Sequence, residues 1–538
     1  MPLSPARTRL ALSFLASIVA VGTPAAAQTP TYDVLLTGGT VIDGSGAPGF
    51  RADVAIQGNR IVRVSALPLA RTSARRVIDA TNRVIAPGFI DLHAHLDPLL
   101  RLPGAESHVR QGVTTALGGP DGGGPFPLGA YLDTARARGL GMNVAFLAGH
   151  NTIRERVLGM ADRAPTAAEL ARMKAMVAQA MSEGAFGLST GLKYLPGAYS
   201  KIDEVIALAE VAADSGGIYT SHLREEGLGL LDGVGEAIEI GRRARIPVVL
   251  THHKAVGKPM WGASVKTLAM IDSARAKGID VMADQYPYTA SYTGIGVLVP
   301  AWASANGDTA FRRRVKEPAT RDSIKRGIVD NILNDRGGGD LARVQFARVA
   351  WDKTLEGKTL ADWAKRKNVA TTPENGAELV IEAMLAGGAS AIYHVMDEGD
   401  VERIMKHPQT MVASDGRLTF PGDGHPHPRW YGTFPRVLGT YVREKRVLPL
   451  ERAVNKMTGM PAARLGLRDR GLVKEGLIAD VVVFDPATIA DQATYERPHQ
   501  YPVGIDYVFV NGTAVVDVGK YTNARAGLVL RRAPGSKR

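Results

Sequence analysis

The chain has 538 residues, a formal net charge of +12, 45% hydrophobic residues, 22% charged residues and no cysteine. This length predicts one large domain with a smaller one beside it. The lack of cysteine excludes disulfides and a lipid-modified N-terminal cysteine, and the ordinary composition excludes collagen, a coiled coil and wholesale disorder. The basic residues are scattered and accompany no nucleic-acid-binding motif, so we expect no nucleic-acid partner.

Residues 1–27 resemble a secretory signal peptide. Arg7 and Arg9 give a positive start, residues 10–21 are apolar, and three alanines precede Gln28 as at a signal-peptidase site. The apolar run is short for a bilayer span. We therefore expect cleavage and export to the bacterial periplasm or beyond, with no membrane insertion afterwards. An uncleaved anchor is the alternative.

The two ends of the remaining chain have similar sequence patterns. Residues 28–85 contain short alternating apolar runs separated by glycine turns, a pattern typical of β-strands. Residues 466–538 repeat this pattern and end in a short basic tail. We expect the two segments to close into one small β-sandwich beside the central region.

The central region, residues 86–465, alternates predicted strands and helices. A capping box, Thr166-Ala167-Ala168-Glu169, predicts the start of an amphipathic helix. Further helices are expected near 201–215, 229–243 and 264–277. About eight such units predict an α/β fold of the (β/α)8 barrel type. A doubly wound sheet is the alternative, but the sequence has no glycine-rich dinucleotide turn.

Two segments of the central region are candidates to cover a site. The interval at about 295–390, between the seventh and eighth predicted strands, is long enough to be an inserted lid. Residues 416–434 are the second candidate.

Predicted strand ends carry residues suited to metal binding. His93 and His95 follow an apolar run, and alternation along a strand places both on one face, where they can hold one ion. A single His-x-His is weak evidence, but other strand ends carry Lys193, His222, His252 and Asp415. The strand ends of a barrel gather at one face. Imidazoles and a carboxylate suit zinc or a similar divalent ion.

The adjacent pair His252 and His253 is expected to point in opposite directions. Alternation along a strand places His252 and Lys254 on one face. If His252 binds a metal, His253 packs outward in a structural role.

Several motifs together resemble the N-acyl-D-amino-acid deacylases of the amidohydrolase superfamily. Besides Asp91-Leu92-His93-Ala94-His95, these motifs occupy residues 190–197, 221–226, 251–254, 284–288, 396–398, 414–416 and 425–436. The resemblance spans nearly the whole chain after the signal segment. It implies a (β/α)8 barrel flanked by a β-sandwich, with a metal centre at the barrel mouth.

The resemblance also implies roles for individual residues. His93 and His95 would hold one zinc ion with Asp415, and His222 and His252 would hold the other, with a binuclear site favoured over a single ion. The substrate carboxylate would be received by Lys254, Tyr286 and Arg429, and the side-chain or acyl pocket would be lined by Tyr393 and Met396. An arginine fork and a lysine point charge both suit a carboxylate.

The sequence departs from some family members at one metal ligand. Those members use a cysteine after the second strand, whereas this chain reads Gly118-Gly119-Pro120-Asp121-Gly122. Two dications need a bridging anion, and we favour Lys193 as N6-carboxylysine, as in dihydroorotase-like relatives. Asp121 is the rival bridge, and a one-metal site is the third alternative.

The predicted function is zinc-dependent hydrolysis of the amide bond of a small-molecule N-acyl-D-amino acid. Asp415 would accept a proton from the attacking water and then protonate the leaving amine. A dipeptidase or isoaspartyl-type peptidase is the nearest alternative. A hydantoinase-like cyclic amidase is disfavoured by the predicted carboxylate site, and an inactive ligand-binding barrel is disfavoured by the full ligand set.

Overall fold

The computed structural model describes residues 1–2 and 31–532 of the chain. The predicted signal peptide lies almost wholly outside these residues. Within the described part of the chain, no helix is both long and apolar enough to cross a bilayer.

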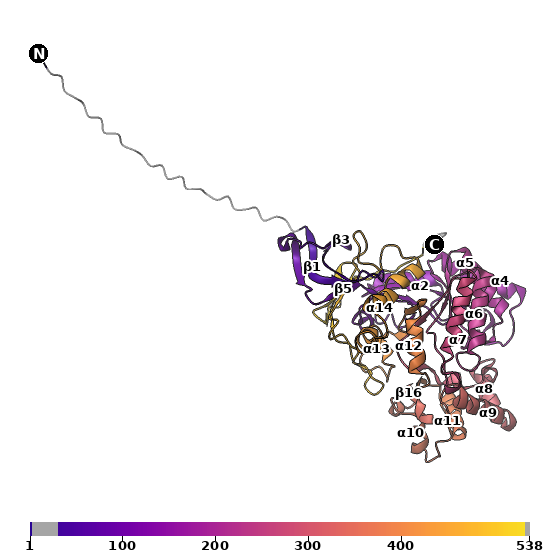
Figure 1. Cartoon of the computed structure of the whole chain (residues 1–538). Helices are drawn as coiled ribbons and strands as arrows, with labels where there is room; N and C mark the ends of the chain where they lie inside the picture. The colour runs from indigo at the N-terminus through magenta and orange to yellow at the C-terminus, as the bar shows by residue number, and fades with distance from the viewer. Residues whose placement is uncertain (3–30, 533–538) are drawn as a thin grey trace.

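The two ends of the chain meet in one nine-stranded sheet (Figure 1). Strand β5 (Val84–Pro87) from the N-terminal side pairs antiparallel with β20 (Val481–Phe484) from the C-terminal side. One core under the sheet takes Leu36, Ile85, Val483 and Phe509 from both ends. The other strands are β1 (Tyr32–Val41), β2 (Phe50–Gln57), β3 (Arg60–Ser65), β4 (Ala74–Asp79), β21 (Ile505–Val510), β22 (Thr513–Asp517) and β23 (Lys520–Tyr521).

The centre of the molecule contains parallel strands that are buried on both faces. The longest sheet joins, in order, β10 (Ala148–Gly149), β11 (Gly187–Gly191), β12 (Ile218–His222), β13 (Val248–Leu250), β14 (Val281–Gln285) and β18 (Thr410–Val412). A second joins β6 (Phe89–Asp91), β8 (Val113–Gly118) and β9 (Asn143–Phe146), and a third pairs β7 (Ala94–His95) with β19 (Gly416–Arg417). Burial between helices explains the continuous apolar runs of these strands. The fold is α/β, and its hydrogen-bonded ladders among the described strands form three separate parallel sheets.

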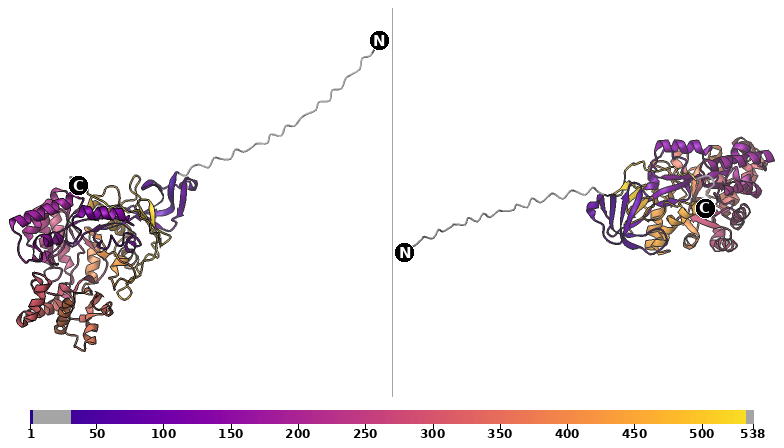
Figure 2. Two further views of the ribbon diagram at one scale, coloured as in Figure 1. Left: turned by 180° about the vertical axis from the view of Figure 1, so that it is seen from behind. Right: turned by 90° about the horizontal axis from the view of Figure 1, so that it is seen from above.

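The helices predicted between these strands are confirmed. They are α4 (Ala167–Ser182), α5 (Ile202–Asp214), α6 (Leu230–Ala244) and α7 (Ser264–Ala276), which lie side by side along one flank of the molecule (Figures 1 and 2). The capping box also forms, because the Thr166 side chain accepts from the Glu169 backbone and the Glu169 carboxylate accepts from the Thr166 backbone. The remaining helices of this region are α1 (Glu106–Val109), α2 (Leu128–Arg138), α3 (His150–Leu158), α12 (Glu398–Lys406), α13 (Arg429–Arg436), α14 (Leu450–Met457) and α15 (Gly459–Leu465), with a π-helix at Val437–Glu444.

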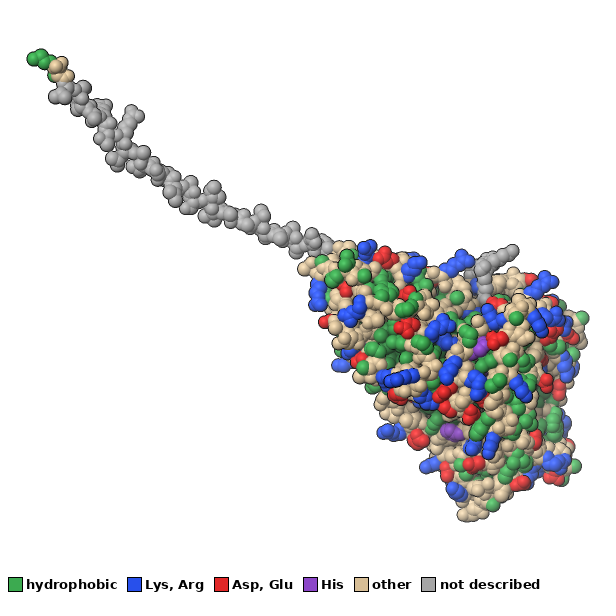
Figure 3. Space-filling view, in the orientation of Figure 1, with side chains coloured by type: hydrophobic (Ala, Val, Ile, Leu, Met, Phe, Trp, Pro, Cys, Tyr) green, Lys and Arg blue, Asp and Glu red, His purple; other side chains and the backbone are tan. Residues whose placement is uncertain are grey.

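Residues 291–395 form a lobe of their own, here called the helical lobe, at one end of the molecule (Figure 1). An antiparallel sheet of β15 (Ser291–Gly294), β17 (Ser390–Tyr393) and β16 (Val344–Arg348) is packed with α8 (Asp308–Lys316), α9 (Pro318–Asn334), α10 (Leu360–Arg366) and α11 (Pro373–Leu385). Ile324, Ile328 and Ile332 recur every four residues along α9 and are buried in a separate apolar core. On the face of the molecule in Figure 3, basic and acidic side chains are interspersed.

Candidate metal centre and active site

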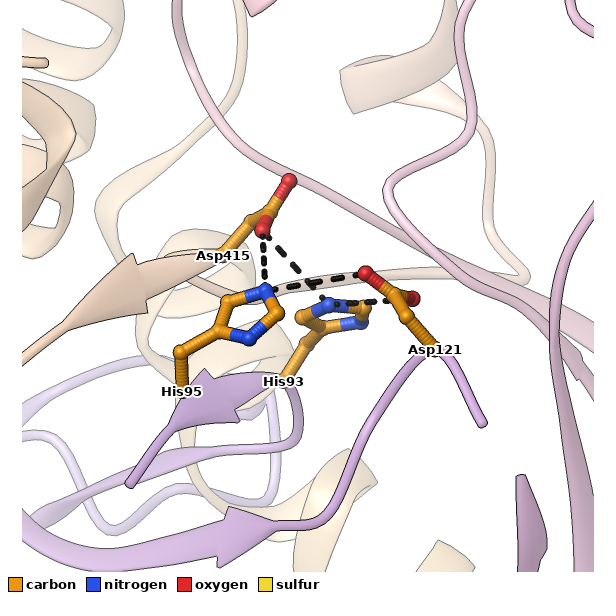
Figure 4. Close-up of side chains that lie close together, drawn as sticks. All are labelled: His93, His95, Asp121 and Asp415. Carbon is orange, nitrogen blue, oxygen red and sulfur yellow. Dashed lines mark hydrogen bonds and ion pairs between the residues drawn. The ribbon is translucent and has the colours of Figure 1, made fainter. Parts of the chain in front are cut away.

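Loops at the carboxyl ends of the parallel strands bring the predicted ligands together. His222 ends β12, His252 follows β13 by two residues, and Asp415 lies just before β19. The possible ligand atoms of His93, His95, Asp121 and Asp415 lie within 4.8 Å of one another, as do those of Asp121, His222 and His252. Figure 4 shows the first group, with all four side chains pointing toward a common centre. The geometry therefore offers two adjoining metal sites.

Asp121 is the residue that the two groups share. Its Oδ1 lies 3.4 Å from Nε2 of His93 and 3.4 Å from Nε2 of His252, and its Oδ2 lies 3.6 Å from Nε2 of His95. The loop after β8 holds Asp121 at a φ of 53°, in the left-handed region that non-glycine residues seldom adopt. Such backbone strain is typical of positions that a functional site over-determines.

Buried atoms without hydrogen bonds test whether these residues fit a metal. Among the described side chains, Nε2 of His93 and Oδ1 of Asp121 are buried, have no hydrogen-bond partner and lie 3.4 Å from each other. Leaving such groups unsatisfied is costly in a folded protein, and a bound cation would satisfy them. Neutral imidazoles with carboxylates are the donor set that zinc takes in hydrolytic sites. The residues present therefore fit one or two zinc ions.

Lys193, the residue predicted to bridge the two ions, lies in an ion-pair cluster in this structure. Its Nζ lies 2.7 Å from Oε2 of Glu225 and 3.5 Å from Oδ2 of Asp335, and neither carboxylate belongs to a ligand group. The lysine lies two residues after β11, and the turn after that strand directs its side chain toward these acidic partners. The shared carboxylate is Asp121, the rival identified from the sequence.

Asp415 is buried between a histidine and an arginine. Its Oδ1 lies 3.1 Å from Nε2 of His95, and its Oδ2 lies 3.0 Å from Nη1 of Arg429. Burial alone would raise the pKa of Asp415, but the guanidinium of Arg429, together with the adjacent histidines, outweighs burial and holds the pKa below its ordinary value. The carboxylate is therefore in the basic form that can accept a proton.

A second buried carboxylate, Glu226, was not identified from the sequence. Its Oε1 lies 2.5 Å from Nζ of Lys254 and 3.3 Å from Nδ1 of His252, and its Oε2 lies 3.1 Å from Nη2 of Arg336. Glu226 lies four residues after His222 within the motif at 221–226, and this position was the available indication in the sequence. Arg336, in the helical lobe, carried no signal in the sequence.

The predicted substrate contacts surround this inner region, which we call the inner pocket. It is lined by His222, His252, Lys254, Tyr286, Arg336 and Asp415, among others. The guanidinium of Arg429 lies 4.6 Å from the centre of the Tyr286 ring, and the Tyr286 hydroxyl donates to Sδ of Met396 at 3.6 Å. Tyr393 is fully buried on β17, with Arg336 over its ring at 5.8 Å. All five predicted contact residues are thus buried around the inner pocket or adjoin residues that line it.

His253 takes the structural role predicted for it, but for another reason. Its Nε2 lies 2.8 Å from the Thr267 hydroxyl of α7, away from the metal groups. Strand β13 ends at Leu250, and His252 has a φ of 39°. A sharp turn after the strand, rather than alternation along it, separates the two rings.

One large cavity borders the metal groups, and a second lies beside the helical lobe. The outer cavity, of about 560 Å³, is bordered by His95, Asp121 and Asp415 and by the side chains of Leu96, Tyr131, Phe146, Tyr292 and Trp430. A second cavity, of about 720 Å³, lies against the helical lobe and is bordered by Lys193, Arg224 and Trp302. Tyr194 and Thr293 line both cavities and the inner pocket, and a hydrogen bond of 3.3 Å joins their hydroxyls.

Comparison with known proteins places this arrangement in a family. A model of the amidohydrolase family matches residues 76–284 and 336–516, and the chain belongs to that family. D-aminoacylase of Alcaligenes xylosoxydans xylosoxydans is 38% identical, over 93% of this chain and 98% of that protein. N-acyl-D-glutamate deacylase of the same organism is 39% identical, over 93% and 96%. The resemblance to the N-acyl-D-amino-acid deacylases is therefore confirmed.

A solved structure extends this similarity to the fold. N-acyl-D-glutamate deacylase from Bordetella bronchiseptica, complexed with zinc and a phosphonate that mimics the tetrahedral intermediate, is 36% identical, with a TM-score of 0.79. The match covers 93% of this chain and 100% of that one. The amidohydrolase-family fold is thus shared over nearly the full length of both chains.

Proposed function

We propose that this protein is a zinc-dependent deacylase that hydrolyses N-acyl-D-amino acids to a carboxylate and a free D-amino acid. The observation that carries the proposal is Asp121, whose carboxylate adjoins both histidine pairs next to Asp415. The similarity to D-aminoacylase and N-acyl-D-glutamate deacylase extends over 93% of the chain and supports a D-amino-acid substrate. The two sequence identities, 38% and 39%, are almost equal, so they do not indicate which amino-acid side chain the enzyme prefers.

We assign one zinc ion to His93, His95 and Asp415 and a second to His222 and His252, with Asp121 between them. A bound zinc ion lowers the pKa of water and polarises a carbonyl group. Asp121 replaces the N6-carboxylysine that we expected at Lys193, because its carboxylate reaches both pairs without modification. Binding of two dications is favoured by this extra negative charge.

Asp415 then serves as the proton carrier of the reaction. Its depressed pKa keeps the carboxylate ionised in the resting enzyme, so it accepts the proton of the attacking water. The same oxygen later gives this proton to the amine nitrogen as the amide C–N bond breaks. His95 and Arg429 hold the carboxylate from both sides, which fixes its direction during both transfers.

The inner pocket supplies the site for the substrate α-carboxylate. Lys254 and Arg429 are buried cations next to Asp415, and Tyr286 lies between them with its ring within 6 Å of both. An anion entering this pocket would gain charge-assisted hydrogen bonds in a region with little water. Tyr393 and Met396 adjoin the same pocket and are our candidates for contact with the amino-acid side chain.

The proposal also includes the domain architecture of the chain and its export to the periplasm. We infer that the three parallel sheets are parts of one (β/α)8 barrel over about 86–465, since their carboxyl ends converge on a single centre. We assign the terminal sheet to a β-sandwich domain formed by residues 28–85 and 466–538, and the interval 295–390 to an insertion. The composition of residues 1–27 supports a cleaved signal peptide and periplasmic export.

The decisive experiment measures turnover with purified, zinc-loaded protein. N-acetyl derivatives of D- and L-amino acids are compared with dipeptides and a hydantoin, and a chelator-treated sample is the control. We expect turnover of the N-acetyl-D-amino acids, loss of activity after chelation and recovery on adding zinc. Faster turnover of dipeptides or of the cyclic amide would contradict the proposal.

A further inference from the structure

We infer that the outer cavity is the acyl-binding site and that it selects large apolar acyl groups, such as hexanoyl or phenylacetyl, over acetyl. This inference rests on the proposed function and specifies its substrate class. It starts from the different chemistry of the spaces on the two sides of Asp415, the inner pocket and the outer cavity.

The inner pocket suits the amino-acid half of the substrate. The pocket and the adjoining Arg429 bring together three buried cations and two buried carboxylates, so the balance of charge attracts a further carboxylate. The cations are Lys254, Arg336 and Arg429, the carboxylates are Glu226 and Asp415, and the space enclosed is only about 10 Å³. A charged group held there points the scissile amide toward Asp415 and Asp121. The acyl group on the other side of the amide must then extend into the outer cavity, which also borders both aspartates.

The lining of the outer cavity is aromatic. Tyr131 and Phe146 meet edge to face at 5.3 Å between ring centres, and Tyr292 and Trp430 meet in the same way at 5.2 Å. Leu96 adds an aliphatic side chain beside the metal group. Aromatic surfaces of this kind bind apolar groups by burial and by edge or face contacts.

The size of the cavity exceeds what an acetyl group needs. Its volume is about 560 Å³, whereas a cavity that just holds one water-sized group, such as a methyl, has a volume of about 10–15 Å³ by the same measure. An acetyl methyl would leave most of this lining in contact with water. A six-carbon or phenyl-bearing acyl group would cover much of it and gain the corresponding burial.

The charged side chains at the cavity offer an alternative that the test must separate. Besides Asp121 and Asp415, the cavity is bordered by Asp97 and Arg417. These two side chains have opposite charges, so they give the cavity no net preference for an anion. An acyl group that carries a terminal carboxylate, such as succinyl, is the substrate class that Arg417 alone would favour.

The first experiment compares acyl groups on one amino acid. The zinc-loaded full-length protein is assayed with the acetyl, butanoyl, hexanoyl, phenylacetyl and succinyl derivatives of the D-amino acid whose acetyl derivative it turns over fastest. We expect kcat/KM to rise about fourfold for each added methylene, as ~0.8 kcal/mol per buried CH2 implies. The hexanoyl derivative should then exceed the acetyl derivative on the order of 100-fold.

The second experiment locates the selectivity within the molecule. In Tyr131→Ala the ratio of hexanoyl to acetyl kcat/KM should fall at least tenfold, while Tyr131→Phe, which keeps the ring, should retain the ratio. Trp302→Ala is the matched control, because Trp302 is 44% exposed and borders the second cavity instead. It should leave the ratio unchanged.

The outcomes separate this inference from the proposed function. If no acyl derivative of a D-amino acid is hydrolysed, the proposed function itself fails. If acetyl is hydrolysed but longer chains are no better, the outer cavity does not select apolar acyl groups and the inference is overturned. The inference is also overturned if the succinyl derivative is turned over faster than the butanoyl derivative. The same holds if the ratio of hexanoyl to acetyl kcat/KM changes in Trp302→Ala and not in Tyr131→Ala.

Discussion

Nη1 of Arg429 lies 3.0 Å from Oδ2 of Asp415, so the expected anchor of the substrate carboxylate also holds the proposed proton carrier. The other oxygen of Asp415 is 3.1 Å from Nε2 of His95. One carboxylate thus connects the metal group to the inner pocket. This connection explains why the pKa of Asp415 stays low in a buried position, where burial alone would raise it.

Replacement of Asp415 tests its role as proton carrier. The Asp415→Asn amide keeps the shape of the side chain but cannot accept the proton of water. We expect kcat to fall on the order of 10³-fold or more, with some loss of unfolding free energy as well, because the buried Arg429 loses its charged partner. Turnover and bound zinc are measured on the same samples, and near-native kcat would refute the assignment.

The choice between Asp121 and Lys193 as bridge is tested by metal content. Asp121→Ala removes the carboxylate that adjoins both histidine pairs, so zinc per chain should fall. Lys193→Ala removes only an ion pair with Glu225 and Asp335, so zinc per chain should not change. Elemental analysis after dialysis measures both. Loss of zinc in Lys193→Ala with retention in Asp121→Ala would restore the carboxylysine bridge.

Two adjacent glutamates provide a matched test of the buried charge network. Glu226 pairs with both Lys254 and Arg336 in the interior, and Glu226→Gln removes the negative charge that the two cations share. We expect a loss of about 3–5 kcal/mol in unfolding free energy. Glu225, whose side chain is 44% exposed, is the control.

The effect of the control should be small. Because exposed ion pairs contribute little, Glu225→Gln should cost less than about 1 kcal/mol. Urea unfolding of both variants gives the comparison. Equal stability losses would show that the network does not depend on the burial of Glu226.

The lowered pKa of Lys456 should make the stability of the protein depend on pH. Burial, and then the charge of Arg452, lower the pKa of Lys456 from 10.5 to about 7, although its Nζ donates to the backbone oxygens of His407 and Thr410. Between pH 7 and 10 the unfolded chain therefore binds one more proton than the folded chain. Stability of the native protein should rise with pH in this window, by up to about 1.4 kcal/mol per pH unit.

A variant without this lysine isolates the effect. Lys456→Met lacks the titrating amine, so the unchanged protein should gain melting temperature relative to the variant between pH 7 and pH 9. Calorimetry at the two pH values measures the difference. A constant difference between the two proteins would show that Lys456 does not titrate in this range.

The sequence by itself determined the candidate ligands at the strand ends, the helices between the strands and the family. The candidate ligands were identifiable because each lies at the end of a strand or within three residues after one, and strand and helix periodicities are local properties of the chain. They are His93, His95, His222, His252 and Asp415. The capping box at Thr166 was identifiable for the same reason, since all of its contacts lie within four residues.

The tertiary structure alone decided what lies between the two histidine pairs and what surrounds them. Lys193 and Asp121 both follow strands, and only the turn after each strand shows that one side chain reaches Glu225 and the other reaches four histidines. Arg336 joins Glu226 across 110 residues of sequence. Such contacts depend on how separate strands and the helical lobe are packed, and no local pattern in the chain encodes the direction of a side chain after a turn.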